Sequence, residues 1–597
     1  MRRRTRERFQ IILLGGTLVV ALLWPLWLVV RGAFLAQDDA WTLHHLRAAI
    51  ADPVARQGLL NALSIAVCVT LGTLALAMPL AMVSTRFAFR GRALLSGLLL
   101  LPMILPPFVG AIGLRHLLGR EGALNAVLVQ WGLVDQGVDW LSVGGFWAVV
   151  LLETLSLQPI VFLNLSAALA NLDPALEEAA ASAGAGRWTR FRRITLPLVR
   201  PGAFAGAVLV FIWSFTELGT PLMFEYRNVT SVQVLEGLKD MEVSRRPYAL
   251  VALMLAVALT AHVVGRRAAR AEAPASHGKA GMARRERTLG VTGTLACWTL
   301  LGGVALLSAL PHLATILASM TPPAQWWGTV LPRMITLEGW REALGHPLAV
   351  SSIRNSLVLA TIATLIATAV GLASARLTVR GAVRGRGLID TLVMLPLAVP
   401  GLVMAFGFVA MSLEWPFGGR MPAALASVTG AILPAAWTGW LSDAPLKPLA
   451  DILGADPNPF PLLIVAYAVR RMPYVARSAA AGLQQTSVSM EEAAWNVGAS
   501  RWTTLRRVVL PLIAANLVAG ALLSFSFSML EVSDSLLLAQ RERDYPITKA
   551  IYVLYDRLGD GEQVAAAMGV WAMALLAVTL LAANAVIGRR MGALFRA

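Results

Sequence analysis

The chain has 597 residues, of which 57% are hydrophobic and 14% charged, and its mean hydropathy of +0.66 excludes an ordinary soluble domain and a disordered chain. The formal net charge of +17 would suit a nucleic-acid-binding protein. That class is excluded as well, because the basic residues stand in short clusters between apolar runs and form no separate polar domain.

The apolar runs predict an all-α, polytopic membrane protein. Twelve runs are long enough to cross a bilayer as helices, six in each half of the chain. They lie near residues 11–30, 60–83, 93–114, 146–169, 202–224, 248–265, 289–318, 354–375, 388–411, 460–482, 512–538 and 565–588. The first follows a basic N-terminus but is too long for the core of a signal peptide, so we expect a retained span.

Arginine clusters predict the orientation of these spans. If the spans alternate, one side of the membrane receives the clusters at 2–8, 86–92, 187–200, 266–287, 376–386 and 589–590. An excess of arginine and lysine marks the cytoplasmic side. We therefore expect both termini to be cytoplasmic.

The two halves of the chain repeat each other. Asn61-Ala62-Leu63-Ser64 aligns with Asn355-Ser356-Leu357-Val358 at an offset of 294, and the offset later rises to 314, so about twenty extra residues are expected within 412–459. Six spans per half give both halves the same orientation, which predicts two parallel six-helix repeats with a pathway between them. Residues 267–287 predict a flexible cytosolic linker between a first half, 1–266, and a second half, 288–597.

Two cytosolic loops, 177–197 and 491–511, carry one motif. Both read Glu-Ala-Ala, three residues, Gly, nine residues, Ile or Val, one residue, Leu-Pro. The acidic start favours a helix, the glycine permits a left-handed turn that ends it, and the proline is expected to break the next short helix and redirect the chain into the following span. Such a helix–turn–helix can seat in a groove of a soluble partner. The matched residues are Glu178, Ala179, Ala180, Gly184, Leu196 and Pro197, and Glu492, Ala493, Ala494, Gly498, Leu510 and Pro511.

This motif resembles the EAA loop of the permease subunits of binding-protein-dependent ABC importers, present twice because two permease halves are fused. The resemblance covers nearly the whole chain and implies the type I ABC importer permease fold in the bacterial inner membrane. It implies as partners two copies of a cytosolic ABC ATPase subunit, an extracytoplasmic substrate-binding protein and the lipid bilayer, without nucleic acid.

No catalytic chemistry is expected in this chain. No Gly-x-x-x-x-Gly-Lys-Ser/Thr loop is present around any of the four lysines. The seven histidines form no metal-ligand cluster and no catalytic triad. We therefore expect no catalytic residue, no metal site and no cofactor here, and we expect a separate subunit to bind and hydrolyse Mg-ATP.

Fused two-half permeases of this kind are similar to the ferric-iron importer permeases. In that family the region after the fifth span of each half approaches the substrate pathway, and here it holds Glu217 and Glu531 at an offset of 314. The resemblance implies a candidate pathway flanked by Glu217 and Glu531, with Asp534 and Arg470 nearby, and the carboxylates of the two glutamates would suit a hard cation. The alternative is that the two glutamates lie at the external interface, where they cap helix ends or meet water. Arg470 and Arg471 suit either an anionic ligand or a carboxylate partner.

Ferric iron is the expected cargo, with phosphonate, thiamine or polyamine as alternatives in the same class of importer. Twelve spans in two parallel halves also describe secondary carriers of the major-facilitator type. Those carriers lack EAA loops and need no ATPase, so copurification of a nucleotide-binding subunit would separate the two classes.

Overall fold

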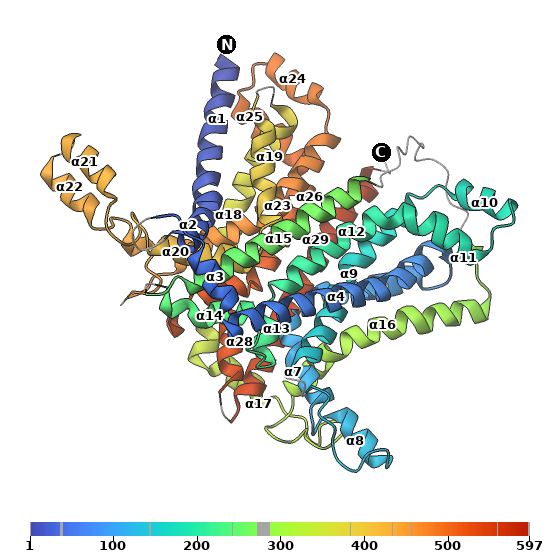
Figure 1. Ribbon diagram of the computed structural model, residues 1–597. Coiled ribbons are helices and arrows are strands. Elements are labelled where there is room, and N and C mark those ends of the chain that lie inside the picture. Colours follow the sequence, from blue (N-terminus) through green and yellow to red (C-terminus); the bar gives the residue numbers. More distant parts are fainter. Residues whose placement is uncertain are drawn as a thin grey trace.

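The computed structural model describes all residues except 1, 36–39, 105, 142–144, 242, 272–286, 382–383, 433, 455, 558 and 595–597. The described chain is a bundle of helices with one pair of two-residue strands (Figure 1). Helices of the first half are α1 (Arg2–Leu18), α2 (Trp24–Phe34), α3 (His44–Ala51), α4 (Pro53–Arg86), α5 (Arg92–Leu98), α6 (Leu101–Ile104), α7 (Pro107–Leu118), α8 (Ala123–Gln130), α9 (Phe146–Ala170), α10 (Pro174–Ser182), α11 (Arg187–Arg190), α12 (Leu196–Phe215), α13 (Gly219–Met223), α14 (Thr230–Glu236) and α15 (Arg246–Ala271).

Helices of the second half are α16 (Val291–Ala318), α17 (Glu338–Gly345), α18 (Pro347–Arg380), α19 (Arg386–Met394), α20 (Gly401–Ser412), α21 (Ala423–Ile432), α22 (Ala435–Ser442), α23 (Phe460–Gln485), α24 (Val488–Asn496), α25 (Arg501–Thr504), α26 (Leu510–Met529), α27 (Ser533–Leu538), α28 (Ile547–Tyr555) and α29 (Gly561–Leu594). Segments of π-helix cover Val19–Leu23, Phe191–Thr195 and Leu505–Val509, and short 3-10 helices cover Gly237–Asp240, Leu395–Leu397, Lys447–Leu449 and Glu542–Asp544. Strand β1 (Phe87–Ala88) pairs in parallel with β2 (Arg287–Thr288).

Most of the predicted spans are continuous helices. Among the described residues, nine helices are long and apolar enough to cross a membrane, and each overlaps a predicted span. Helices α12 and α26 end at Phe215 and Met529, nine residues before the predicted ends at 224 and 538. The predicted spans 93–114 and 388–411 are instead bent pairs of helices, with angles of 98° and 103°. Pro106 and Pro400, at matched positions, lack the N–H that a continuous helix requires, which explains both breaks. The remaining prediction, 460–482, is helix α23, which carries three arginines.

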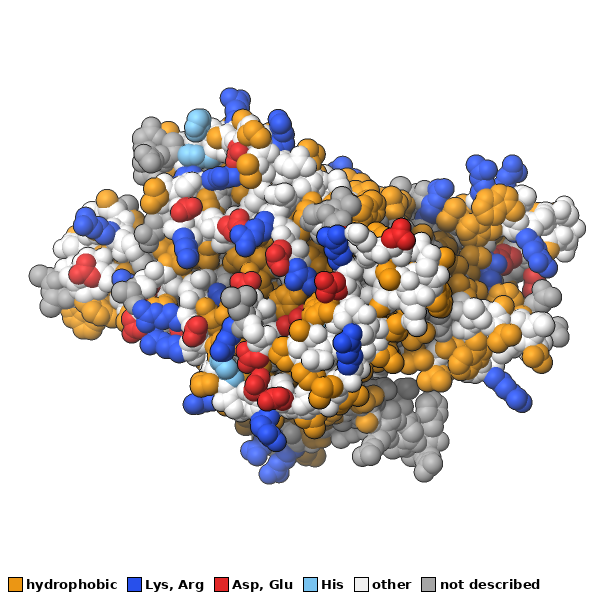
Figure 2. Space-filling model, turned by 90° about the horizontal axis from the view of Figure 1, so that it is seen from below, with side chains coloured by type: hydrophobic (Ala, Val, Ile, Leu, Met, Phe, Trp, Pro, Cys, Tyr) orange, Lys and Arg blue, Asp and Glu red, His pale blue; other side chains and the backbone are white. Residues whose placement is uncertain are grey.

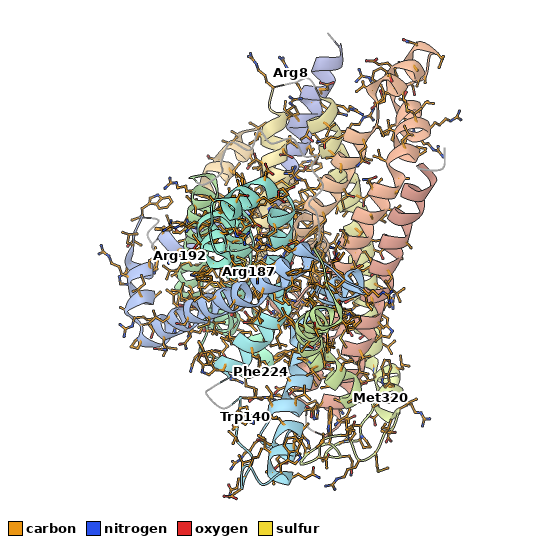
Figure 3. All side chains as sticks on the ribbon, turned by 90° about the vertical axis from the view of Figure 1, so that its right-hand side faces the viewer. Arg8, Trp140, Arg187, Arg192, Phe224 and Met320 are labelled. Atoms are coloured by element: carbon orange, nitrogen blue, oxygen red, sulfur yellow. The ribbon has the colours of Figure 1, made fainter. Side chains whose placement is uncertain are left out.

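The helices expose apolar side chains, as expected of a surface that faces lipid. Leu71 on α4, Leu306 on α16 and Leu365 on α18 are all more than half exposed. Figure 2 shows hydrophobic side chains on the surface between groups of charged ones. Figure 3 places Arg8 at one end of the molecule and Trp140 and Met320 towards the other.

The sequence repeat is also a structural repeat. Helices α3, α4 and α7 begin and end 294 residues before α17, α18 and α20, and α10 to α13 precede α24 to α27 by 314 residues. The offset therefore rises between α20 and α23, within the predicted stretch 412–459. There α21 and α22 project sideways from the bundle (Figure 1).

The two halves interlock through their first spans. Helix α2 of the first half packs against α20 of the second, and α16 of the second half packs against α7 of the first. Helix α15 continues to Ala271, five residues into the predicted linker 267–287, because arginine and alanine are good helix formers. Residues 272–286 lie outside the described residues, so the flexible linker and the boundaries at 266 and 288 stay predictions.

Candidate functional site

The two EAA loops have the same backbone architecture. Each consists of a nine-residue helix (α10 or α24), a glycine turn, a four-residue helix (α11 or α25), five residues of π-helix and a 20-residue helix (α12 or α26). The predicted helix–turn–helix is therefore present twice, and each copy is joined directly to a long apolar helix.

A left-handed glycine ends the first helix of each loop, as predicted. Gly184 and Gly498 both have a φ of +83°, a conformation that is strained for residues with a Cβ. The N–H of Ala185 donates to the carbonyl of Ala180, and in the second loop Ala499 donates to Ala494. These bonds satisfy carbonyls that the helix end would otherwise leave unpaired.

The expectation that proline breaks the next helix is wrong. Pro197 lies in the first turn of α12, and the backbone is helical on both sides of it. The π-helical segment explains this continuity, because the N–H of Leu196 donates five residues back to Phe191. Widening the helix one turn before the proline accommodates the missing N–H, and Leu510-Pro511 repeats the arrangement.

An arginine at the end of the second span anchors each loop. Arg86 of α4 pairs with Glu177 at 2.5 Å, and Thr195 donates to the same carboxylate at 2.6 Å. In the second half Arg380 of α18 donates to the buried Glu491 at 3.1 Å. Sequence reasoning singled out the next glutamates, Glu178 and Glu492, and missed these two ion pairs. The arginines, Arg86 and Arg380, nevertheless match at the offset of 294.

The second glutamate of each pair faces outward. Glu178 and Glu492 are exposed, and neither has a hydrogen bond or ion pair within the described part of the chain. Apolar side chains are exposed beside them at matched positions, namely Leu176 with Met490 and Trp188 with Trp502. Ala179 and Ala493 are exposed and Ala180 and Ala494 half-buried, so each loop presents a mixed apolar and acidic surface.

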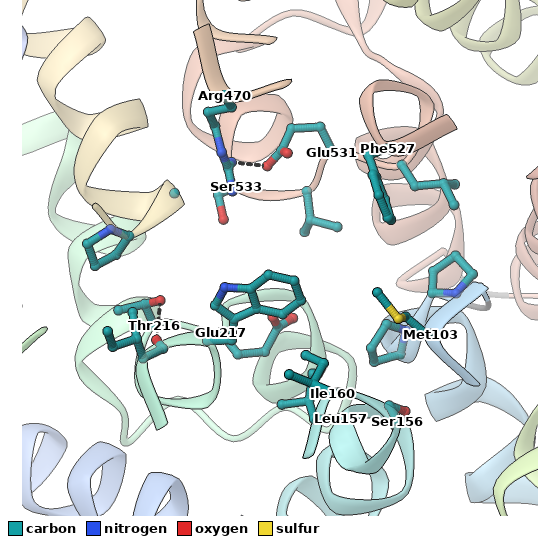
Figure 4. A pocket seen from close by; sticks show the side chains of 18 of the residues that line it. Met103, Ser156, Leu157, Ile160, Thr216, Glu217, Arg470, Phe527, Glu531 and Ser533 are labelled. Atoms are coloured by element: carbon teal, nitrogen blue, oxygen red, sulfur yellow. Dashed lines mark hydrogen bonds and ion pairs between the residues drawn. The ribbon is translucent and has the colours of Figure 1, made fainter. Parts of the chain in front are cut away.

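A cavity of about 250 Å³ lies between the two halves. Its first-half wall comes from α7, α9 and the end of α12, and its second-half wall comes from α20, α23 and the segment after α26. Figure 4 shows Glu217 and Thr216 on one side and Arg470 and Glu531 on the other. The candidate residues Glu217, Glu531 and Arg470 therefore line one space, whereas Asp534 is not among its lining residues, and their role in a pathway stays a prediction.

The second-half wall carries a buried network of two arginines and two acids. Arg470 and Arg471 pair with the two carboxylate oxygens of Glu531, and Arg470 also contacts Asp534 at 3.2 Å. Asp534 is fully buried behind this pair. Gly401 permits the approach of Arg470, because a Cβ there would lie 2.1 Å from the guanidinium. Of the two sequence-based interpretations of the arginines, the carboxylate partner is the one observed.

Glu217 has a different environment from its counterpart. Its Oε1 accepts from the backbone N–H groups of Gly219 at 3.1 Å and Thr220 at 3.3 Å, so it caps the N-terminus of α13. The capping contact of the alternative is therefore present at Glu217, which also lines the cavity. Glu153 of α9 also lines the cavity and accepts from Ser214, and sequence reasoning missed it because a single acid in an apolar run has no motif. Among the described residues, no group of three His, Cys, Asp or Glu is arranged to hold a metal ion.

A family model described as the inner membrane component of binding-protein-dependent transport systems matches residues 74–269 and again residues 367–593. Together these matches cover more than half of the chain. The chain belongs to this family. It is a permease of two fused halves, each with one copy of the family domain, and it has the type I ABC importer permease fold predicted from the loops.

Relatives of this permease include ferric transport permeases. It is 25% identical over 494 residues to the ferric transport system permease protein FbpB of Actinobacillus pleuropneumoniae, over 81% of this chain and 64% of the relative. A ferric transport permease of Haemophilus influenzae is 26% identical over 76% of this chain and 65% of its own length. The permease thus spans less than two thirds of both relatives. The molybdenum transport permease ModB of Haemophilus influenzae is 37% identical over 27% of this chain and 68% of its own length.

Proposed function

We propose that this permease forms the translocation pathway of an ATP-driven importer whose cargo is ferric iron, delivered by an extracytoplasmic binding protein. Two copies of a cytosolic ATPase subunit would seat on the two EAA loops, and those subunits would bind and hydrolyse Mg-ATP. The chain itself would hold no cofactor, and both termini would be cytoplasmic. Membership of the permease family removes the alternative of a secondary carrier.

The observation that carries the ATPase assignment is the duplicated outer surface of the loops. Glu178 and Glu492 are exposed at equivalent positions, and Trp188 and Trp502 are each more than two-thirds exposed. Exposed aromatic residues grouped with a charge are typical of a protein interface. The rigid junction of each loop with α12 or α26 supports a route by which movement of the ATPase reaches the cavity.

The ion pairs of the cavity support a cationic cargo. Glu531 and Asp534 already pair with Arg470 and Arg471, whereas Glu153 and Glu217 form no ion pair among the described residues. An anionic cargo such as a phosphonate would meet no free arginine in this space. The two ferric transport relatives match most of this chain, which supports ferric iron over thiamine or polyamine as the cation.

Reconstitution tests the proposal. The permease would be purified with its ATPase, placed in proteoliposomes with Mg-ATP inside, and supplied outside with binding protein loaded with radioactive ferric iron. We expect ATP-dependent uptake that requires the binding protein and resists competition by excess spermidine, thiamine or phosphonate. Failure of the ATPase to copurify would reject the importer assembly. Uptake of a competitor in place of iron would reject the cargo.

A further inference from the structure

We propose that Glu153 and Glu217 form a one-sided cation subsite on the first-half wall of the cavity, which holds a hard trivalent cation during transit. The inference rests on the proposed function for the identity of the cargo. The geometric observation is that two carboxylates of the first half line the cavity between the halves. Both line the cavity, and they come from different elements, α9 and the turn between α12 and α13.

Glu153 is an unusual residue for an apolar helix. It is 1% exposed, it is the eighth residue of the 25-residue helix α9, and one carboxylate oxygen accepts from the Ser214 hydroxyl. Its other oxygen, Oε1, is buried without a hydrogen-bond partner in the described part of the chain. A buried acid in an apolar span is costly unless a proton or a cation meets it, so its presence in α9 makes it a functional candidate.

Glu217 presents a second carboxylate to the same space. Its Oε1 is held by the backbone N–H groups of Gly219 and Thr220, which fixes the direction of the side chain. Its Oε2 has no hydrogen bond within the described residues. The pair therefore offers two oxygens not engaged by the protein, Oε1 of Glu153 and Oε2 of Glu217, and carboxylate oxygens are the preferred ligands of hard cations.

The second-half wall lacks such a subsite, although the two halves are repeats. At the offset of 314, Glu153 corresponds to Tyr467, whose hydroxyl bonds to Ser535 at 2.7 Å. Ser156 and Leu157 correspond to Arg470 and Arg471, which occupy the carboxylates of that half. The second wall is thus electrically self-compensated, and the two cavity carboxylates that form no ion pair among the described residues lie on the first wall.

Two carboxylates are few for a storage site and suitable for a transit site. No third His, Cys, Asp or Glu completes a metal cluster here among the described residues. Conduction requires that a cation bind well enough to enter and weakly enough to leave. A pair of acids facing a neutralised wall meets both conditions, and it also explains why the site is built from one half only.

Terbium(III), a hard trivalent cation, is the probe for this subsite. Trp213 lines the same cavity and would sensitise the luminescence of terbium bound there. The difference in luminescence between the wild type and Trp213→Phe therefore reports terbium in the cavity and not at other sites. The permease in lipid nanodiscs would be titrated as wild type, Glu153→Gln, Glu217→Gln and the matched control Tyr467→Phe. We expect each glutamine variant to weaken terbium binding about tenfold, the effect of one charged contact, and Tyr467→Phe to leave it unchanged.

Equal titration curves for wild type and both glutamine variants would overturn the subsite, as would an equal loss in Tyr467→Phe. If Glu153→Gln does not yield folded permease by size-exclusion chromatography, Glu153→Asp and Glu217→Gln still test the pair, with binding retained in the first and weakened in the second. Terbium binding that depends on both acids, in a permease that takes up no ferric iron, would reject the proposed cargo and leave the subsite standing.

Discussion

Valine at both Gly184 and Gly498 should uncouple ATP hydrolysis from transport. Both glycines have a φ of +83°, which costs a residue with a Cβ about 1–2 kcal/mol, and more when it is β-branched. No heavy atom lies within 4 Å of the position that a Cβ would take at either site, so the added atoms cause no clash within the chain and the strain falls on the turn. A cost of this size shifts the population of the turn about five- to thirty-fold. We expect α10 and α24 to lose their fixed positions while the spans stay inserted.

The assay measures binding-protein-stimulated ATP hydrolysis and cargo uptake in the same proteoliposomes. Each single variant should be partly impaired, because the other loop remains intact, and the double variant should lose stimulation and uptake. Gly186→Ser is the matched control, since Gly186 has a φ of −64° and the equivalent residue of the second loop is Ser500. Full stimulation and uptake in the double valine variant would refute the coupling role. An equal loss in Gly186→Ser would refute the argument from φ.

Glu491→Gln should loosen the second loop, because Glu491 is buried against two arginines of α18 and removing one partner of a buried pair costs roughly 3–5 kcal/mol. Limited proteolysis should then cut the loop faster, whereas the same change at the exposed Glu492 should leave the rate of cleavage unaltered. Charge reversal at the exposed Arg192 and Arg506 should leave the ATPase bound in detergent, since we expect these residues to meet anionic lipid headgroups; loss of the ATPase on purification would instead indicate a protein contact. Glu531→Gln should lower the thermal stability of the permease by leaving buried arginines without a charged partner, and adding Arg471→Gln should restore part of it; absence of rescue would count against the ion pairs.

Local properties of the chain are sufficient to predict most of the spans, the duplication and the two EAA loops. A run of apolar residues defines a span through its length alone, and a glycine followed by a short basic helix defines the turn at Gly184 through its own backbone freedom. Even the bends at Pro106 and Pro400 had a local signal in the matched prolines. The misread position was Pro197, where a π-helical segment keeps the helix continuous and no sequence rule signals that segment.

Tertiary structure alone decided which charged groups meet. Glu177 was passed over in favour of Glu178, because only the packing of the loop against the end of α4 brings Arg86 to one glutamate and leaves its neighbour exposed. The same holds for Glu153, whose partner Ser214 is 61 residues away, and for Arg470, whose partner Glu531 is equally distant in sequence. In an apolar bundle, a charged side chain is paired or left without a partner according to which side chains the facing helix places beside it. That depends on how the helices pack.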